Sequence, residues 1–430
     1  MAVVKKNIGT VDLVSSMLRT NSVYVEIDGS TRRITLDNLM DSINSGNEQL
    51  LRQVAWGVPI KQASQSSPAW GTIGNTTMWE QFKESIGDYL LTTSGKAAKL
   101  SATDRTIFAD GTTVDETKGN VMFHAPKLYY LVQTDAITGI PYLWMSMYPI
   151  GGFYIEASWI GAYMGYNLNG TLVSRSGYTP TGMQTVSSFW NLAHNNGKDF
   201  GLTNYDHHRL MMMLNLSEYG NPNAQANIGY GCSGDGNTWD KTNGLKTGAT
   251  SGIGDACGKI SIADVAGNAN ASRVSLFGIE DAWGWYWQMI QSIFFGNSAN
   301  AAQNGSEAFI YEGNRMPTAA ELTTAPVGNY RQATRLTTPT EGWVQNMLMG
   351  GYFDLIPSKI GGDSNSYWTD YSYQNTTGQL CLFGGNAFDG ALGGLAYVNS
   401  RHAFSRAHAL CGARLAYYGN DVEIVNGADL

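Results

Sequence analysis

A chain of 430 residues with a formal net charge of −8 is long enough for about three domains, or for one long irregular domain with an appendage. Charged residues make up only 14 %, against 51 Gly, 12 Trp and 23 Tyr, which favours a loop-rich, β-containing protein. The negative charge argues against nucleic acid as a partner, because phosphate binding needs clustered Lys and Arg. The sequence contains no run of about 18 apolar residues, so we expect no membrane insertion. The N-terminus lacks the apolar core of a signal peptide.

The first 62 residues have the pattern of a separate module. VYVEIDG at 23–29 and RRITL at 32–36 predict two strands around an Asp-Gly turn, and apolar residues then recur at helical spacing over 35–54. A unit this small buries too little apolar surface to be stable alone. We therefore expect residues 1–62 to assemble with copies of themselves or with a larger particle. Packing of the apolar stripe onto the following domain is the alternative.

A linker and a helix are expected over residues 63–94. Gly, Ser, Gln and Pro dominate the stretch GVPIKQASQSSPAWGTIGN. Thr77 followed by Glu80 forms a capping-box pattern that predicts a helix start, with Trp79, Phe82, Ile86 and Leu90 on one face of the helix.

From residue 95 onward, short apolar runs alternate with Gly-rich loops. KLYYLVQ at 127–133 and YLWMSMY at 142–148 predict a hairpin, and two strands are expected near 272–287. Helices are predicted over 184–195 and over 203–219, the second capped by Thr203. The second helix contains a run of three methionines that we interpret as core: Met211, Met212 and Met213.

Sites for metals, nucleotides and reactive thiols find little support. GIGDACGKI at 252–260 departs from the phosphate-loop pattern, and His207 and His208 are adjacent on a helix, so they point apart and are expected to be structural. The loop with Asp235, Asn237 and Asp240 could hold Ca²⁺, but a solvated turn is the preferred interpretation. We expect no cofactor.

The four cysteines form no CxxC pair, and we expect free buried thiols, with a Cys232–Cys257 bridge as the alternative.

The segment 384–419 is the candidate recognition surface. Repeated Gly beside changing polar and aromatic side chains suggests rigid loops that present a surface, although an ordinary Gly-rich meander is the alternative. Arg414 is expected to be structural. The candidate ligand-binding residues are Asn386, Phe388, Asp389, Tyr397, Asn399, Arg401, His402, Phe404, Arg406 and His408.

Three passages together resemble a known family. They are FGIEDAWGWYWQMI at 277–290, GGNAFDGALGG at 384–394 with SRAHALCGARL at 405–415, and EYGNPNAQANIGYG at 218–231. They are similar to the formylglycine-generating-enzyme-like branch of the C-type lectin fold, and to phage and Bacteroides-type proteins whose lectin domain ends in a region diversified by reverse transcription. The resemblance implies an α+β, loop-rich, C-type-lectin-like domain over residues 95–430, with Trp283, Trp285, Trp287 and Arg414 as its scaffold.

The function that the resemblance implies is that of a phage fibre or tail receptor-binding protein in the virion. It would bind a host-surface glycan or protein without turnover, attach to other virion proteins through residues 1–62, and form a homotrimer. Tyr397 and Phe404 would stack on the ligand while Asn399, Arg401 and His402 supply hydrogen bonds. A structural head-fibre or decoration protein is the alternative. A formylglycine-generating oxidase is disfavoured, because that branch needs two nearby cysteines, whereas 30 positions separate Cys381 from Cys411.

Overall fold

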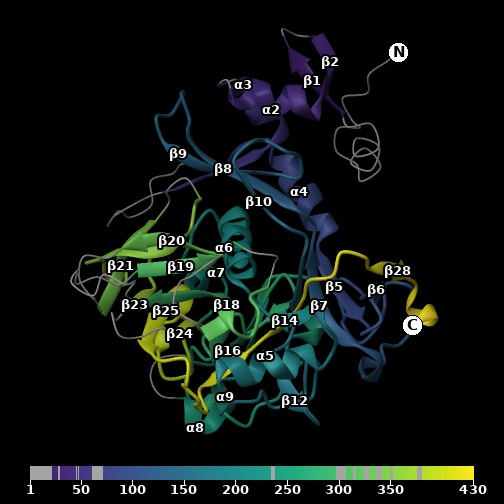
Figure 1. Cartoon of the computed structure of the whole chain (residues 1–430), viewed down its shortest axis with the longest axis vertical. Helices are drawn as coiled ribbons and strands as arrows, with labels where there is room; N and C mark the ends of the chain where they lie inside the picture. The colour runs from purple at the N-terminus through teal and green to yellow at the C-terminus, as the bar shows by residue number, and fades with distance from the viewer. Residues whose placement is uncertain are drawn as a thin grey trace.

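The computed structural model describes residues 22–27, 30–44, 46, 48–60, 71–233, 238–296, 307–312, 316–323, 329–335, 341–348, 352–374 and 380–430. These residues form an α+β protein rich in sheets and long loops, as the composition predicted (Figure 1). No helix within these ranges is long and apolar enough to span a membrane.

The N-terminal elements are a hairpin and two short helices. The predicted strands are confirmed as β1 (Ser22–Ile27) and β2 (Ser30–Thr35), which pair antiparallel. The single helix predicted over 35–54 is instead two helices, α2 (Leu36–Asn44) and α3 (Glu48–Val54). Gly46 lies between them with φ of 90°, a left-handed conformation that ends the first helix.

These elements pack against the residues that follow them. Leu39 and Leu51 are buried in one apolar cluster with Trp56 and Leu143. Arg52 of α3 forms an ion pair with the buried carboxylate of Asp135, in the turn after β8. Among the described residues, this contact favours the alternative in which the apolar stripe packs onto the next part of the chain. Assembly through residues 1–62 stays a prediction.

Three larger sheets occur in the described part of the chain, and the first lies next to the N-terminal elements. The predicted hairpin is confirmed, with Val132 opposite Leu143. In spatial order the strands of this sheet are β10 (Phe153–Ile155), β8 (Leu128–Thr134), β9 (Pro141–Ser146), β3 (Trp56–Pro59) and β4 (Ile73–Gly74). Because β3 pairs with β9, the residues just before position 62 belong to the same sheet as residues 128–155.

The second sheet joins the middle of the chain to its C-terminus. Strand β27 lies between β14 and β11, and β28 runs parallel to β6 at the sheet edge. In spatial order its strands are β14 (Phe200–Leu202), β27 (Leu415–Tyr417), β11 (Ser158–Gly161), β7 (Asn120–Ala125), β5 (Gly87–Leu91), β6 (Lys96–Lys99) and β28 (Glu423–Val425).

The third sheet carries the candidate recognition segment. Its strands in spatial order are β20 (Tyr330–Arg335), β19 (Glu307–Tyr311), β18 (Trp287–Gly296), β24 (Leu380–Gly384), β25 (Gly394–His402), β23 (Tyr371–Tyr373), β21 (Glu341–Leu348) and β22 (Ile356–Ile360). A further strand, β26 (Cys411–Ala413), pairs in parallel with the start of β18.

The predicted helices form with shifted ends, and Leu90, predicted on the apolar face of the first, lies in β5 because that helix ends at Ser85. They are α4 (Thr76–Ser85), α5 (Val186–His194) and α6 (Tyr205–Tyr219). Helix α4 is capped by Asn75 instead of Thr77, and α6 by Asn204 instead of Thr203. Helix α6 contacts both β18 and β25, and the Met211–Met213 run is buried as predicted.

Shorter elements fill the connections. The strands near 272–287 are shorter than predicted, because β17 ends at Glu280 and β18 begins only at Trp287. The short elements are β12 (Tyr166–Leu168), β13 (Thr171–Val173), β15 (Gly258–Ser261), β16 (Ser272–Leu276), β17 (Ile279–Glu280), α7 (Ala224–Asn227), α8 (Trp239–Thr242), α9 (Ala263–Ala266), and the 3-10 turns η2 (Glu116–Lys118), η3 (Gly231–Ser233), η4 (Ser251–Ile253), η5 (Glu321–Thr323), η6 (Gly390–Leu392) and η7 (Gly427–Asp429).

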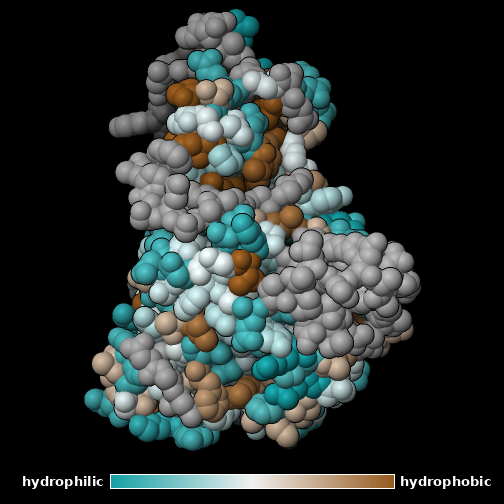
Figure 2. Space-filling view, turned by 90° about the vertical axis from the view of Figure 1, so that its left-hand side faces the viewer, coloured by the Kyte–Doolittle hydropathy of each residue, from teal (hydrophilic) through white to brown (hydrophobic). Residues whose placement is uncertain are grey.

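The face of the molecule shown in Figure 2 changes in surface character from top to bottom. On the face shown in Figure 2, hydrophobic residues gather in the upper part, and polar residues cover most of the lower part. The upper part is at the height of the N-terminal elements in Figure 1, and β24 and β25 lie in the lower half.

Candidate functional site

The candidate site is the C-terminal surface, which we define as residues 385–393 and 401–410. The first loop joins β24 to β25, and the second contains the end of β25 and the connection to β26. The two loops leave opposite ends of the same antiparallel strand pair, because Gly384 lies opposite Gly394 at one end and Leu380 opposite His402 at the other. The second segment then runs back toward the first, since Leu410 packs against the apolar cluster that contains Ala387. Loops that are held on rigid strands are a common basis for presenting side chains to a partner.

The loop 385–393 is held in one conformation by its own side chains. The Asp389 carboxylate accepts a hydrogen bond from the Asn386 amide at 2.6 Å, and the Asn386 side-chain oxygen accepts one from the Phe388 amide at 2.7 Å. Burial raises the pKa of Asp389 to about 6, so the group is still largely an ionised acceptor at neutral pH. Asn386 itself is buried, so it supports the loop and does not face a ligand.

Contacts from a second part of the chain fix the outer side of this loop. Gln225 donates to the Gly390 carbonyl at 2.8 Å, and the Thr238 amide donates to the Ala387 carbonyl at 3.1 Å. Gly390 adopts φ of 56°, which an L-residue rarely accepts. The passage at 218–231 that carries part of the resemblance thus contributes directly to the support of this surface.

The segment 401–410 alternates in exposure from one residue to the next. Most of its large side chains are half-buried, and the exposed positions are small residues apart from Arg401. The half-buried residues are His402, Phe404, Arg406, His408 and Leu410, and the exposed ones are Arg401, Ala403, Ser405, Ala407 and Ala409. Phe404 packs edge-on against Phe294, with 5.9 Å between ring centroids, which explains its partial burial.

Arg401 and His402 give this segment its polar character. The exposed Arg401 guanidinium lies 4.4 Å from the centroid of the Tyr373 ring, a cation–π contact that orients it. Burial, with the nearby charges of Arg406 and Arg401, lowers the pKa of His402 to about 4. His402 is therefore neutral at physiological pH and can both donate and accept a hydrogen bond.

Tyr397 was expected to stack on a ligand, and this prediction is wrong. Its side chain is 4 % exposed, and its ring packs edge-on against Trp287, with 4.6 Å between centroids. Tyr397 is part of the apolar core beneath the surface. Of the predicted residues, Phe388 and Arg401 are exposed, and the half-buried ones are Asp389, Asn399, His402, Phe404, Arg406 and His408.

Met183 joins this surface, although the sequence did not indicate it. It is 63 % exposed and adopts φ of 56°, and its amide donates to the His408 carbonyl at 3.0 Å. The adjacent Gly182 touches Ala409 so closely that a Cβ would lie 2.5 Å from the Ala409 carbonyl oxygen. The two residues are more than 220 positions from the segment they adjoin, so no local sequence pattern links them to it.

Arg414 anchors the surface to the rest of the protein, as predicted. The guanidinium is fully buried and donates to the carbonyls of Gly161, Ala162, Glu280 and Asp281 at 2.8–3.1 Å. One side chain thereby connects the end of β26 to β11 and β17. The predicted scaffold tryptophans are buried too: Trp283, Trp285 and Trp287.

The described residues contain no candidate metal site. Asp235 and Asn237 of the suggested calcium loop lie outside the described residues, and Asp240 is exposed on α8. Across the described ranges, no group of three His, Cys, Asp or Glu side chains is placed to hold a metal ion.

All four cysteines are free, so the Cys232–Cys257 bridge does not form. Burial raises the pKa of Cys411 to about 11, which disfavours the thiolate that an oxidase of this type would need.

Comparison with known proteins finds likeness only among solved structures. No family model matches the chain, and no curated protein does. The chain is similar to the Major Tropism Determinant M1 variant, with a TM-score of 0.27 and 14 % identity, over 93 % of this chain and 86 % of that one. The U1 variant matches with a TM-score of 0.26 and 14 % identity, over 78 % and 72 % of the two chains. These low TM-scores do not establish a shared fold, and the C-type-lectin assignment stays a prediction.

Proposed function

We propose that this protein is a phage receptor-binding protein that attaches to a host-surface glycan or protein through the C-terminal surface. The observation that carries this proposal is the contrast between two layers. Trp287 and Tyr397 form a buried layer, and the Tyr397 ring lies against Gly385 of a loop whose outward side chains differ widely in chemistry. A fixed framework under varied side chains is suited to recognition, because little conformational entropy is lost on binding.

The contacts would come from a mixed set of groups. Phe388 offers an exposed ring, Met183 a flexible apolar chain, and Arg401 an oriented cation. Such contacts are individually weak, and a homotrimer attached to the virion through residues 1–62 would convert them into avidity. Diversification of the segment by reverse transcription and a C-type-lectin topology belong to the same proposal, with the sequence resemblance as their support.

Adsorption of the purified protein to host cells tests this function. Replacing Phe388 and Arg401 together with Ala should weaken cell binding by about tenfold or more, because both side chains are exposed and neither supports the fold. Ile424→Ala is the matched control, since Ile424 is an exposed apolar residue on the distant strand β28. Unchanged adsorption by the double variant would instead favour the structural head-fibre or decoration role.

A further inference from the structure

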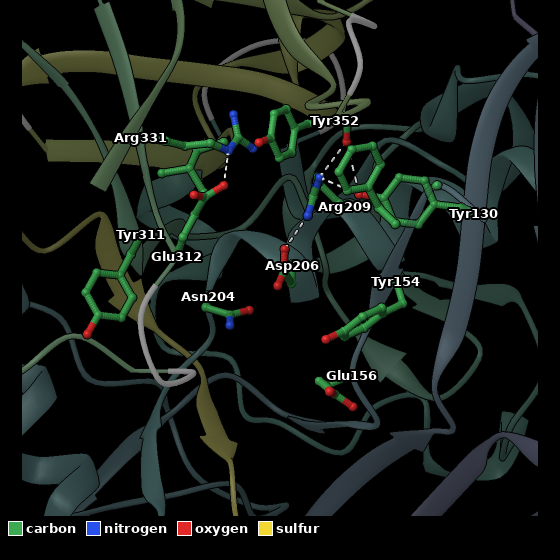
Figure 3. A pocket seen from close by; sticks show the side chains of 13 residues that line it. Tyr130, Tyr154, Glu156, Asn204, Asp206, Arg209, Tyr311, Glu312, Arg331 and Tyr352 are labelled. Carbon is green, nitrogen blue, oxygen red and sulfur yellow. Dashed lines mark hydrogen bonds and ion pairs between the residues drawn. The ribbon is translucent and has the colours of Figure 1, made fainter. Parts of the chain in front are cut away.

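A polar and aromatic cavity lies outside the C-terminal surface. It has a volume of about 440 Å³ and opens between β8, β10, the first turn of α6, and strands β19 and β20 (Figure 3). No residue that lines it belongs to 385–393 or 401–410. Its volume is within the range of about 300–1,000 Å³ that is usual for small-molecule sites.

Tyrosine rings form the walls of this cavity. Figure 3 shows Tyr154 and Tyr311 on opposite sides, with Asn204 and Asp206 between them. Tyr154 is 51 % exposed, and Lys127, which does not line the cavity, holds the ring with its ammonium nitrogen 4.1 Å from the centroid. Tyr154 is therefore a fixed and accessible apolar face. An aromatic face of this kind suits a ligand with a flat C–H surface.

The floor of the cavity is rigid. Arg209 donates to the Tyr130 hydroxyl at 2.9 Å and to the Tyr352 carbonyl at 3.1 Å, and it pairs with Asp206. The guanidinium of Arg331 lies 3.9 Å from the centroid of the Tyr352 ring and donates to Asp354 at 2.9 Å. These contacts hold the polar groups in place before any ligand arrives.

The charges around the cavity are already compensated. Each charged group has an oppositely charged partner: Arg209 pairs with Asp206, Arg331 with Glu312 and Asp354, and Lys127 with Glu156. Among the described residues that line the cavity, a strongly charged ligand would find no unpaired counter-charge and would have to displace one of these pairs. A neutral ligand would not have to displace any of these ion pairs.

Hydrogen-bonding capacity nevertheless remains at the cavity wall. The side chains of Asp206 and Glu312 are 41 % and 46 % exposed, so their carboxylate oxygens are accessible to donors beyond their arginine partners. A carboxylate has about four acceptor positions, and one arginine contact leaves several of them available. Hydroxyl groups are neutral donors that fit these positions.

A smaller cavity extends the site. It has a volume of about 40 Å³ and shares Glu156, Asn204 and Asp206 with the larger one, while Ser158 and Tyr418 line only the smaller one. The two cavities therefore have a polar wall in common, and we refer to them together as the groove.

We propose that this groove binds a neutral saccharide, with Tyr154 under the C–H face of a sugar ring and the carboxylates of Asp206 and Glu312 accepting from its hydroxyls. A polyhydroxylated, uncharged ligand with an apolar face matches all three features of the groove: the Tyr154 ring, the accessible carboxylate acceptors and the ion pairs that compensate the charges. The site does not depend on the receptor role proposed for the C-terminal surface.

Saturation-transfer NMR on the full chain tests this site. The probes are the methyl glycosides of glucose, galactose, mannose and N-acetylglucosamine, with galacturonate and glucosamine as the charged comparisons. At least one neutral glycoside should bind, and Tyr154→Ala should weaken that binding by about tenfold. Glu312→Gln keeps the side-chain shape and should weaken it by about threefold, so the test does not rest on one variant. Circular dichroism checks that both variants are folded.

The control is Phe388→Ala, which should leave glycoside binding unchanged, because Phe388 lies on the C-terminal surface. Tyr154→Ala should likewise leave the surface loops intact. The proposal is overturned if no neutral glycoside binds, if the charged sugars bind better than the neutral ones, if both cavity variants bind like the unaltered chain, or if Phe388→Ala abolishes glycoside binding.

Discussion

Single buried polar residues determine how the C-terminal surface is held, and Asp370 is one of them. Its carboxylate is buried and accepts a hydrogen bond from the Ala396 amide of β25 at 2.6 Å. Gly394 lies so close that a Cβ there would be 2.3 Å from the carboxylate. Burial raises the pKa of Asp370 from its ordinary 3.8 to about 7, partly offset by the Ala396 hydrogen bond.

This raised pKa predicts a pH-dependent stability. The folded chain holds the Asp370 proton more tightly than the unfolded chain does. The contribution of Asp370 to stability is therefore complete below about pH 4 and is lost as the pH rises through about 7. Asp370→Asn removes the titrating carboxyl group. The free energy of unfolding of this variant, relative to that of the unaltered chain, should therefore rise between pH 4 and pH 8, by at most about 4 kcal/mol.

Urea unfolding at several pH values measures this difference. Ser364→Ala is the control, because Ser364 is exposed and carries no titratable group, so its replacement should give a difference that does not vary with pH. Other buried carboxyls such as Asp281 are present in every variant, so their effect cancels. Parallel pH profiles for Asp370→Asn and the unaltered chain would contradict the assignment.

The structural role of Arg414 could be predicted from the sequence, because a guanidinium among apolar residues needs buried hydrogen-bond acceptors. A lone Arg between two apolar strands must be buried and satisfied by carbonyls, and Arg414 is. Which side chains of the segment 401–410 are buried could not be predicted from the sequence. Their burial depends on contacts such as that of Phe404 with Phe294, more than 100 positions apart. Period alone does not choose a face.

At the scale of elements, the loop 385–393 is stabilised by one carboxylate. Asp389→Ala removes the acceptor of the Asn386 amide and leaves that donor without its partner. The local cost is about 1–2 kcal/mol, so amide hydrogen exchange of residues 386–392 should become about tenfold faster or more. Exchange in β25 should not change, because its strand pairing does not involve Asp389.

Mass-spectrometric hydrogen exchange resolves this effect by segment. Ala391→Ser is the matched control in the same loop, since Ala391 is exposed. If Asp389→Ala accelerates exchange throughout β24 and β25 as well, the carboxylate stabilises the whole strand pair and not the loop alone.

Elements were predictable where local signals were strong. Apolar periodicity and polar caps located α5 and α6, and alternation located the β8–β9 hairpin. Cap positions shifted by one or two residues, because neighbouring short polar residues compete for the same role. At α6, the backbone amide of Thr203 donates to the Arg414 carbonyl, and the side-chain oxygen of Asn204 accepts from the His207 amide as the cap.

At the scale of the molecule, the sheets join segments far apart in the sequence. Strand β27 pairs with β14 and β11, which lie more than 200 positions earlier. No sequence pattern encodes which edge such a strand takes, because pairing partners of this kind are chosen by the packed core as a whole. The cavity of Figure 3 has the same origin, since its walls come from six separate stretches of chain.

The same long-range packing predicts that the N-terminal elements do not unfold independently. Leu51 is fully buried in α3, in the cluster that contains Trp56 and Trp144 of the first sheet. Leu51→Ala should lower the free energy of unfolding by about 2–5 kcal/mol. Because the cluster is shared, tryptophan fluorescence and circular dichroism should report one coincident transition, shifted to lower denaturant.

Gln49→Ala is the control for this substitution, because Gln49 is exposed on the same helix and its replacement should change stability by less than about 0.5 kcal/mol. An early transition in circular dichroism without any change in tryptophan fluorescence would have the opposite meaning. It would show that the residues before Trp56 unfold by themselves, as a separate assembly module would. A coincident shift instead makes α3 a structural part of the first sheet, with the Arg52–Asp135 pair as its polar contact.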